Sequence, residues 1–219
     1  MSTPGSSPAM ALFPRLSEST TRMLLEKAKK WGLRRGEVLM RQGSPSVHAF
    51  LIESGGVLLL RTDDCGEEVA LDLLGPGGFC GIEDALCGQP HELSGRATTK
   101  TVCYSISAHA ICEVVSNDVS VAKVLARYVA TRLRLAAEHM EILALDNIEE
   151  RVKRILQRLM LKNGQRHGSC LLLPITQGDL ASLVGGSRQS VNRSLAGLKL
   201  RGIVRSHQRH ISVSEALVS

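Results

Sequence analysis

Short apolar segments alternate with turn-forming residues through the first half of the chain. Glycine-rich turns such as Gly55–Gly56 and Gly75–Gly78 separate these segments. The segments are Val38–Met40, Ala49–Ile52, Val57–Leu60, Val69–Leu74 and Thr101–Ile106. Many short strands with regular turn signals are typical of a β-sandwich or barrel, which often leaves an internal cavity for a small ligand. The pattern therefore predicts a jelly-roll-like β-barrel, preceded by a helix over Ser17–Trp31.

A long helix is predicted next, because apolar residues recur at alternating spacings of three and four. We call this set the seam stripe; it consists of Val119, Ala122, Ala126, Val129, Leu133, Ala136, Met140 and Leu143. Such a heptad pattern favours a coiled-coil contact, and its alanines permit close helix approach. We expect it to be the seam of a parallel homodimer, because the stripe would otherwise stay wet. The alternative is a core helix within one chain.

The segment after the seam stripe predicts one more helix and a strand. Ile148–Leu161 carries apolar residues on one face and basic residues elsewhere, as an amphipathic helix does. Asn163–Gly168 is interpreted as a loop, and Leu171–Ile175 as a short apolar strand.

Two short helices joined by a glycine turn are predicted within Thr176–Val204. Thr176 and Asp179 have the spacing of a capping box, with Asp in place of the usual Glu. Gly185–Gly186 makes the turn, and Ser187 suits the N-cap of the second helix. Leu180, Leu183 and Val184 on the first helix, and Val191, Leu195 and Leu198 on the second, would form the contact between them. This arrangement is a helix-turn-helix.

The second helix presents polar residues opposite its apolar face. In a helix-turn-helix, the N-terminal residues of this helix enter the major groove, where Arg suits guanine and Asn or Gln suits adenine. After Gly202, Ile203–Ser206 and His210–Val213 alternate like a two-stranded wing, whose Arg205 and Arg209 could reach the backbone. The expected DNA-contacting residues are Ser187, Arg188, Gln189, Ser190, Asn192, Arg193, Gln177, Thr176 and Arg209.

The charge is distributed unevenly along the chain. Residues 1–150 hold 15 Lys/Arg and 19 Asp/Glu, whereas residues 151–219 hold 12 Lys/Arg and two acids, a net charge of +10. A basic segment of this strength favours a polyanionic partner, although a solvated basic surface is the alternative. It argues against an adaptor whose helix-turn-helix contacts protein.

The composition is that of a soluble globular protein, with 43% hydrophobic and 22% charged residues. No apolar run is long enough to span a bilayer, and Met1–Ala11 lacks the features of an export signal. We therefore expect a cytoplasmic protein without a membrane partner. The six cysteines form no CxxC pair, so neither a disulfide framework nor a metal site is expected.

The sequence thus predicts an α+β chain of four parts. They are a disordered tail (1–13), a β-barrel sensor domain (14–115), a dimerisation helix (116–145) and a winged helix-turn-helix domain (146–219). An enzyme is not expected, because motifs such as GxSxG, HExxH and the P-loop are absent and no stretch is left for a catalytic domain.

These motifs together resemble the CRP/FNR family of bacterial transcription regulators, over nearly the whole chain from Leu16 to Val213. The matching segments are Gly36–Gly43, Gly75–Gly81, Ala130–Leu133 and Leu183–Arg193. The resemblance implies a cyclic-nucleotide-binding-like barrel, a homodimer, a palindromic duplex DNA site and RNA polymerase as a partner. Arg188 and Arg193 stand where family members use Arg on bases, whereas Gln189 replaces a usual Glu. Because Gln prefers adenine or can serve either way, the half-site is expected to differ from the common TGTGA or TTGAT types, or to be read more loosely.

The resemblance also indicates where an effector would bind. Cyclic-nucleotide members neutralise the phosphate with an Arg-Ser pair, but the matching positions here are Leu93-Ser94. Their Thr-Ser pair on the dimer helix is replaced by Ala136-Ala137. Conventional cyclic AMP contacts are therefore not expected. The candidate effector residues are Gly81, Glu83, Ser94, Arg96 and Cys80.

The resemblance also points to other cofactors that the family uses. Residues 1–64 contain no Cys, which argues against an iron–sulfur cluster. Haem is an alternative, because Cys80 resembles the Cys ligand of the family's CO sensor, with His91 or His109 as a second ligand. A thiol switch of Cys80 and Cys87 is another alternative. The sequence leaves open the effector, the target genes, the half-site, and activation versus repression.

Overall fold

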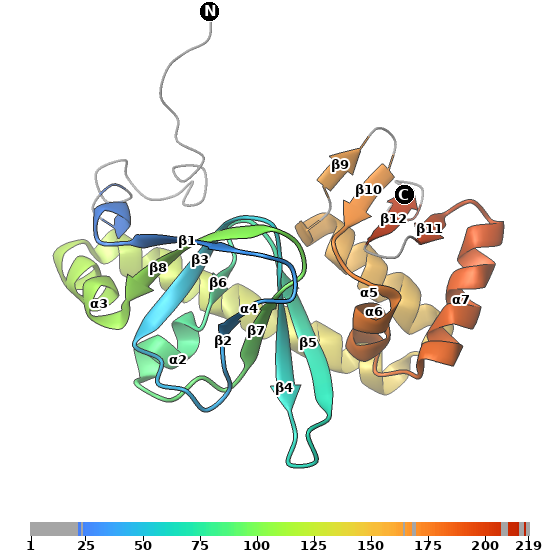
Figure 1. The fold of residues 1–219 in the computed structure, drawn as a ribbon, viewed down its shortest axis with the longest axis horizontal. Coiled ribbons are helices and arrows are strands. Elements are labelled where there is room, and N and C mark those ends of the chain that lie inside the picture. The colour runs from blue at the N-terminus through green and yellow to red at the C-terminus, as the bar shows by residue number, and fades with distance from the viewer. Residues whose placement is uncertain are drawn as a thin grey trace, which may run out of the picture. The chain divides into compact units, whose positions relative to one another are not determined.

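The computed structural model describes residues 22, 24–163, 165–167, 170–206, 210–214 and 217. The chain divides into two compact units, Met1–Val57 with Leu74–Leu133, and Leu58–Leu73 with Arg134–Ser219. The elements, drawn in Figure 1, are β1 (Lys29–Leu33), β2 (Val38–Met40), β3 (His48–Ser54), β4 (Val57–Thr62), β5 (Glu68–Leu74), β6 (Phe79–Cys80), α2 (Ile82–Cys87), β7 (Ser94–Ala97), β8 (Thr101–Ser107), α3 (Ala108–Asn117), α4 (Val119–Leu145), α5 (Ile148–Asn163), β9 (Gln165–His167), β10 (Cys170–Leu173), α6 (Gln177–Val184), α7 (Arg188–Leu200), β11 (Val204–Ser206) and β12 (Ile211–Ser214).

The first unit is built around an antiparallel sheet with the strand order β1-β8-β3-β6. In its middle, Leu51 of β3 lies opposite Tyr104 of β8 on one side and Phe79 of β6 on the other. Strand β2 pairs with β7, where Val38 lies opposite Arg96. Figure 1 shows β1, β8 and β3 side by side, with α3 following the end of β8. The predicted β-rich N-terminal domain is therefore confirmed.

The N-terminal helix prediction was wrong at its end. Lys29–Leu33 forms strand β1, in which Trp31 lies opposite Cys103 of β8. Hydrogen bonding to β8 selects the extended conformation, although four of the five β1 residues are exposed and carry little apolar alternation. The rest of Ser17–Ala28 is described only at Arg22, at 24–26, which are helical, and at 27–28; the disordered-tail prediction for 1–13 lies outside the described residues.

The core of the first unit lies between this sheet and the helices that follow it. Leu51, Ile82, Ile106 and Ile111 are fully or almost fully buried there, and Val121 at the start of α4 joins them. Helix α2 begins at Gly81, whose φ of +68° is left-handed, and ends at Gly88, also left-handed. A Cβ at Gly81 would lie 2.6 Å from Cε1 of His91, so the turn has no room for a larger residue.

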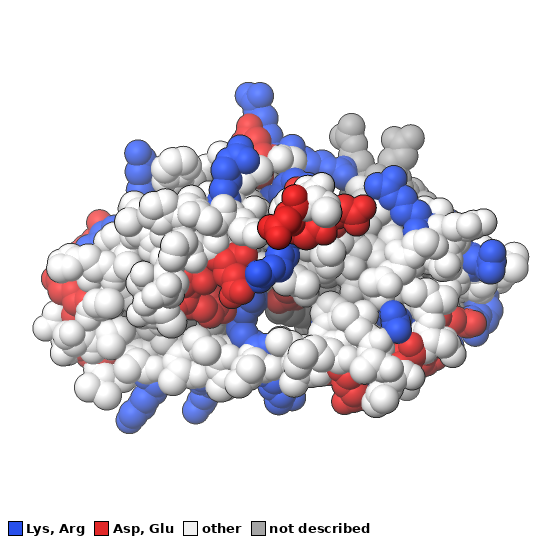
Figure 2. Space-filling model, turned by 90° about the horizontal axis from the view of Figure 1, so that it is seen from below, with Lys and Arg blue, Asp and Glu red and all other residues white. Residues whose placement is uncertain are grey.

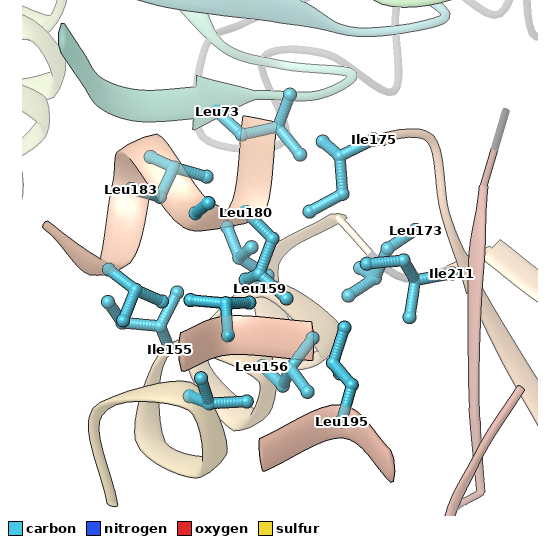
Figure 3. Packing of buried hydrophobic residues seen from close by; sticks show 14 of the residues in the cluster. Leu73, Ile155, Leu156, Leu159, Leu173, Ile175, Leu180, Leu183, Leu195 and Ile211 are labelled. Carbon is cyan, nitrogen blue, oxygen red and sulfur yellow. The ribbon is translucent and has the colours of Figure 1, made fainter. Parts of the chain in front are cut away.

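The second unit has one core shared by α5, α6, α7, the C-terminal strands and the hairpin segment 58–73. Its sheet has the order β11-β12-β10-β9. Figure 3 shows Leu73, which belongs to β5, facing the same core as Leu183 and Ile175. The backbone N–H of Ala70 also donates to Oγ of Ser182 on α6, at 2.6 Å. The hairpin segment is therefore part of the packing that holds α6.

The interpretation of Asn163–Gly168 as a loop was also wrong. Its residues 165–167 form strand β9, which pairs with β10 in the register Cys170↔His167. The partner strand β10 ends at Leu173, two residues before the predicted end. Polar residues on an edge strand give little sequence signal, since only the pairing orders them.

Helix α4 has one face that contacts its own chain and a second face that carries most of the seam stripe. The residues that face its own chain are all buried or half-buried and keep spacings of four and three: Val121, Leu125, Tyr128, Arg132, Leu135, His139 and Ile142. Most of the seam stripe lies on another face, but its last member, Leu143, is half-buried, and its Cδ2 would lie 3.4 Å from a Cβ at Gly185 of the same chain. Three of its members, Val119, Leu133 and Met140, are 67%, 71% and 66% exposed. No helix among the described residues has the length and apolar content that a membrane crossing requires.

Candidate nucleic-acid interface

Helix α6 begins at the predicted capping box. The backbone N–H of Asp179 donates to Oγ1 of Thr176 at 3.1 Å, and the backbone N–H of Thr176 donates to Oδ2 of Asp179 at 2.8 Å. These two bonds satisfy amide groups that a helix N-terminus otherwise leaves without partners. The shorter Asp side chain therefore does the work of the usual Glu.

The turn between α6 and α7 depends on two glycines. Gly185 ends α6 with a left-handed φ of +64°, and its N–H reaches the carbonyls of Ala181 and Ser182. A Cβ at Gly186 would lie 2.4 Å from Cδ1 of Ile148, the first residue of α5. The double glycine therefore serves both the backbone conformation and the close approach of the turn to α5.

Helix α7 is capped by Ser187 and held by one apolar face. The Ser187 Oγ accepts from the backbone N–H of Ser190 at 3.1 Å. Val191, Leu195 and Leu198 are completely buried, which confirms the predicted packing face. The helix is thus fixed from one side and leaves its other side to the solvent.

The exposed side of α7 carries the predicted base-contacting residues. Arg188, Gln189, Asn192 and Arg193 are all exposed on its first two turns. The guanidinium of Arg188 lies over Gly178 of α6, where a Cβ would be 3.6 Å from its Nε. The structure therefore brings these four side chains to one surface whose hydrogen-bonding groups point into solvent.

The predicted backbone-contacting residues differ in their surroundings. Ser187 is exposed and Ser190 is half-buried, and their hydroxyls lie 2.9 Å apart. Thr176 and Gln177 are half-buried, and the Thr176 hydroxyl donates to Oδ2 of Asp179 at 2.7 Å. Arg209 lies outside the described residues.

The predicted wing is present as an antiparallel pair. Val204 of β11 lies opposite Val213 of β12, and Ser206 lies opposite Ile211. Arg205 is exposed on β11. On the face drawn in Figure 2, acidic and basic side chains are interspersed, so neither sign covers that face. The excess positive charge of residues 151–219 is therefore not displayed there as one uniform patch.

The candidate effector residues of the first unit are near one another in the chain but differ in solvent exposure. Gly81 forms the left-handed turn before α2, and Cys80 is fully buried in β6. The Ser94 Oγ accepts from the backbone N–H of Gln42 at 3.0 Å. Arg96 is half-buried on β7 and has polar interactions of its own. These contacts serve the protein itself.

Glu83 is held by a residue that sequence reasoning missed. Nε of Arg132, on α4, donates to Oε1 of Glu83 at 3.0 Å. One turn earlier on α4, the Tyr128 hydroxyl accepts from the backbone N–H of Phe79 at 2.8 Å and lies 3.2 Å from its carbonyl. Burial raises the pKa of Tyr128 strongly, so this hydroxyl stays protonated. The available signal was the spacing of Val121, Leu125, Tyr128 and Arg132 on one helix face.

The residues considered for haem binding or a thiol switch differ in burial, and one of them already contacts a carboxylate. His91 is buried, and its Nδ1 lies 3.2 Å from Oδ2 of Asp84. Cys80 is buried whereas Cys87 is exposed. Within the described residues there is no cluster of three or more side chains suited to bind a metal ion.

Comparison with known proteins relates both units to one family. A model of the cyclic nucleotide-binding domain matches residues 31–118, and a model of the Crp-like helix-turn-helix domain matches residues 150–216. The structure of FixK2 from Bradyrhizobium japonicum has a TM-score of 0.76 at 24% identity, covering 85% of this chain and 92% of that one. It shows the same fold.

Two relatives match over most of their length. The CRP-like cAMP-activated global transcriptional regulator of Mycobacterium tuberculosis is 26% identical over 207 residues, 94% of this chain and 92% of that protein. The Cyclic AMP receptor protein of Thermus thermophilus is 32% identical over 181 residues, 83% of this chain and 82% of that protein. With this identity over both units, the chain belongs to the CRP/FNR family of transcription regulators and carries that family's helix-turn-helix DNA-binding domain.

Proposed function

We propose that this protein is a dimeric, sequence-specific DNA-binding regulator. A signal sensed in its N-terminal β-barrel gates it, and this signal does not act through the contacts that family members make with cyclic AMP. The observation that carries the first part is α7, whose apolar face is completely buried while Arg188, Gln189, Asn192 and Arg193 face solvent. A rigid helix with donors and acceptors on its free side is what major-groove reading requires.

Each of the four exposed residues on the first two turns of α7 has a proposed role. Arg188 and Arg193 donate to guanine O6 and N7, whereas Gln189 and Asn192 pair with adenine. Ser187 and Ser190 bind phosphate together with the free N–H groups at the helix start, and Thr176, Gln177 and Arg209 add backbone contacts. Gln189 shifts the preferred half-site away from that of relatives with Glu.

The exposed seam stripe supports a homodimer. Its large residues Leu133 and Met140 are more than half exposed in the single chain, and a second α4 packed in parallel would cover them. Two copies of α7 would then read a palindrome with half-sites about one helical turn apart. RNA polymerase is the proposed protein partner, and the cytoplasm the proposed compartment.

The gating signal is proposed from what surrounds the candidate effector residues. Relatives are named as activated by cAMP, but here Glu83 is paired with Arg132, and Ala136 and Ala137 offer no hydroxyl to a base. A different small molecule that contacts Gly81, Ser94 and Arg96 would fit better. The haem and thiol alternatives are less favoured, because Cys80 is buried and Asp84 already binds His91.

The experiment is selection from random duplexes, followed by affinity measurements on the selected site. Arg188→Ala should lose about 1–3 kcal/mol of discrimination at one base pair of each half-site. Arg201→Ala is the matched control: Arg201 follows α7 in the chain but is 3.3 Å from Glu149, and its loss should leave sequence preference unchanged. Unaltered selectivity in Arg188→Ala would refute the assignment.

A further inference from the structure

A groove between α4 and α5 in the second unit has no role in the proposed reading of DNA. Its volume is about 510 Å³, which is within the range of sites that hold metabolite-sized ligands. We call it the arginine groove; its lining residues are Arg134, Leu135, Glu138, Arg154, Gln157, Arg158 and Leu161. None of these residues belongs to α6 or α7, so the proposed contacts with DNA do not account for the groove.

Arg158 is the unusual member of this lining, because it is a buried cation whose two hydrogen bonds within the described residues both go to neutral acceptors. Its exposed fraction is 9%. Nη1 donates to the carbonyl of Leu135 at 3.3 Å, and Nη2 donates to Nδ1 of His139 at 3.0 Å. Both acceptors are neutral. A guanidinium carries five N–H groups, so three of them have no acceptor among the residues that the structure describes.

Buried donors without acceptors are rare in folded proteins and commonly indicate a bound water or ion. Desolvation lowers the pKa of Arg158, and the carboxylates of Asp72 and Glu138 act against this shift. No ion pair joins Arg158 to Glu138 in the described part of the chain, although both carboxylates act on Arg158 through their charge. The positive charge of Arg158 is therefore only partly compensated by the protein.

The other two arginines of the groove differ in their ion-pair partners. Arg154 is bound by Glu141 and Asp146, each at 3.0 Å, so its charge is already matched. Arg134 is exposed, and no described side chain pairs with its guanidinium. Two guanidinium groups, from Arg134 and Arg158, thus border the groove without an ion-pair partner among the residues that the structure describes, and Glu138 supplies a carboxylate to the same lining.

We propose that the arginine groove binds a small molecule carrying a phosphate or carboxylate group. The oxyanion would accept hydrogen bonds from the unused N–H groups of Arg158 and from Arg134, in the forked geometry that guanidinium groups favour. Glu138 and Gln157 would contact hydroxyl or amino groups of the same molecule. Leu161, which is 76% exposed, would cover its apolar part.

The groove is connected to the helix-turn-helix through one side chain. His139 accepts from Arg158 at Nδ1, and its Nε2–H donates to the carbonyl of Leu183, in the last turn of α6, at 2.9 Å. An anion bound to the unused N–H groups would draw the Arg158 guanidinium toward the groove and so weaken its hydrogen bond to Nδ1 of His139. Binding in the groove would therefore change how α6 is held, and this consequence rests on the proposed function of the helix-turn-helix.

Calorimetric titration of the full-length protein tests the site directly. Inorganic pyrophosphate and citrate are the two probes, and they separate a phosphate preference from a carboxylate preference. Arg134→Ala should weaken binding of the preferred anion by about tenfold, the effect of losing one charge-assisted contact. Arg158→Met should abolish it. Arg127→Ala, an exposed arginine on α4 outside the groove, is the matched control and should bind as the wild type does.

The outcomes separate the alternatives. Absence of binding for both probes would overturn the proposal, as would equal weakening in Arg134→Ala and Arg127→Ala, which indicates a general charge effect. Wild-type affinity in Arg134→Ala would place the anion elsewhere, for example on α7. Because Arg158 is buried, its variant is checked for folding by circular dichroism, and exposed Arg134 keeps the test valid if it unfolds. DNA affinity at saturating anion is measured separately; no change would overturn the connection to α6.

Discussion

At the scale of residues, His139 joins three helices of the second unit through a fixed tautomer. The guanidinium of Arg158 can only donate, so Nδ1 of His139 must be the acceptor and Nε2 must carry the proton that Leu183 accepts. Protonation of Nδ1 would break the contact with Arg158 and place two cations together. Burial, followed by the charge of Arg158, accordingly lowers the pKa of His139 below its ordinary value of 6.5.

This lowered pKa predicts acid sensitivity. Between the folded-state pKa of His139 and pH 6.5, the unfolded chain binds the extra proton and the folded chain does not. The free energy of unfolding should therefore fall as the pH decreases below about 6.5, and this contribution should be fully lost below the folded-state pKa. Urea unfolding as a function of pH measures it. In His139→Gln the dependence should be shallower; an identical slope in both proteins would contradict the tautomer assignment.

At the scale of elements, the helix-turn-helix is held by its ends as much as by its core. Thr176 and Asp179 close the start of α6, Gly185 ends it, and Ser187 starts α7. Because both helices are short, the loss of one cap removes a large part of the hydrogen bonding that orders the first turn.

Thr176→Ala should therefore destabilise the protein by about 1 kcal/mol, since alanine cannot accept from the Asp179 amide. Denaturant unfolding measures the change. Thr176→Ser retains the hydroxyl and should recover most of the stability. If serine and alanine were equally destabilising, the methyl group of Thr176 rather than its hydroxyl would be responsible.

Strong periodicity made some of these elements predictable. The seam stripe predicted a long helix, but the predicted bounds of 116–145 were wrong at the start, because α3 runs to Asn117 and α4 begins at Val119. Val38–Met40 was found with its observed bounds. The capping box and both glycines of the turn were recognised because they carry local backbone requirements. The four exposed residues of α7 followed from the position of its apolar face.

Other features depend on partners that are distant in the chain. Strands β1 and β9 are polar edge strands whose conformation is decided by β8 and β10. The Arg132–Glu83 pair joins residues 49 positions apart; the spacing along α4 places Arg132 on the inward face but does not identify Glu83 as its partner. The packing of hairpin segment 58–73 against residues 134–219 was not predictable either. The strand pattern of this segment looks the same as that of the strands before and after it, so the sequence does not show that it belongs to the second unit.

At the scale of the whole molecule, the seam stripe predicts that two copies of the chain assemble through α4. Leu133→Asp would place two carboxylates opposite each other in a parallel seam, so the protein should sediment as a monomer. Its affinity for a full palindrome should fall by about two orders of magnitude, because the second half-site would no longer be bound by a linked copy. Analytical ultracentrifugation and DNA titration measure the two effects.

The matched control is Leu145→Asp, which adds the same charge to the same helix. Leu145 is 77% exposed but lies off the seam stripe. This variant should remain a dimer with wild-type DNA affinity. Dissociation of both variants would mean that charge on α4 in general, rather than the seam stripe, decides assembly.

The hairpin segment 58–73 also constrains the order in which the molecule matures on the ribosome. Leu58, Leu60, Ala70 and Leu73 belong to a core whose other members lie at Ile142 and beyond. These four side chains can therefore be buried only after the last third of the chain has been synthesised, and they stay exposed to solvent in the nascent chain until then. By the same reasoning, residues 134–219 expressed alone would lack part of their own core, so a single cut in the chain cannot yield a fully packed second unit.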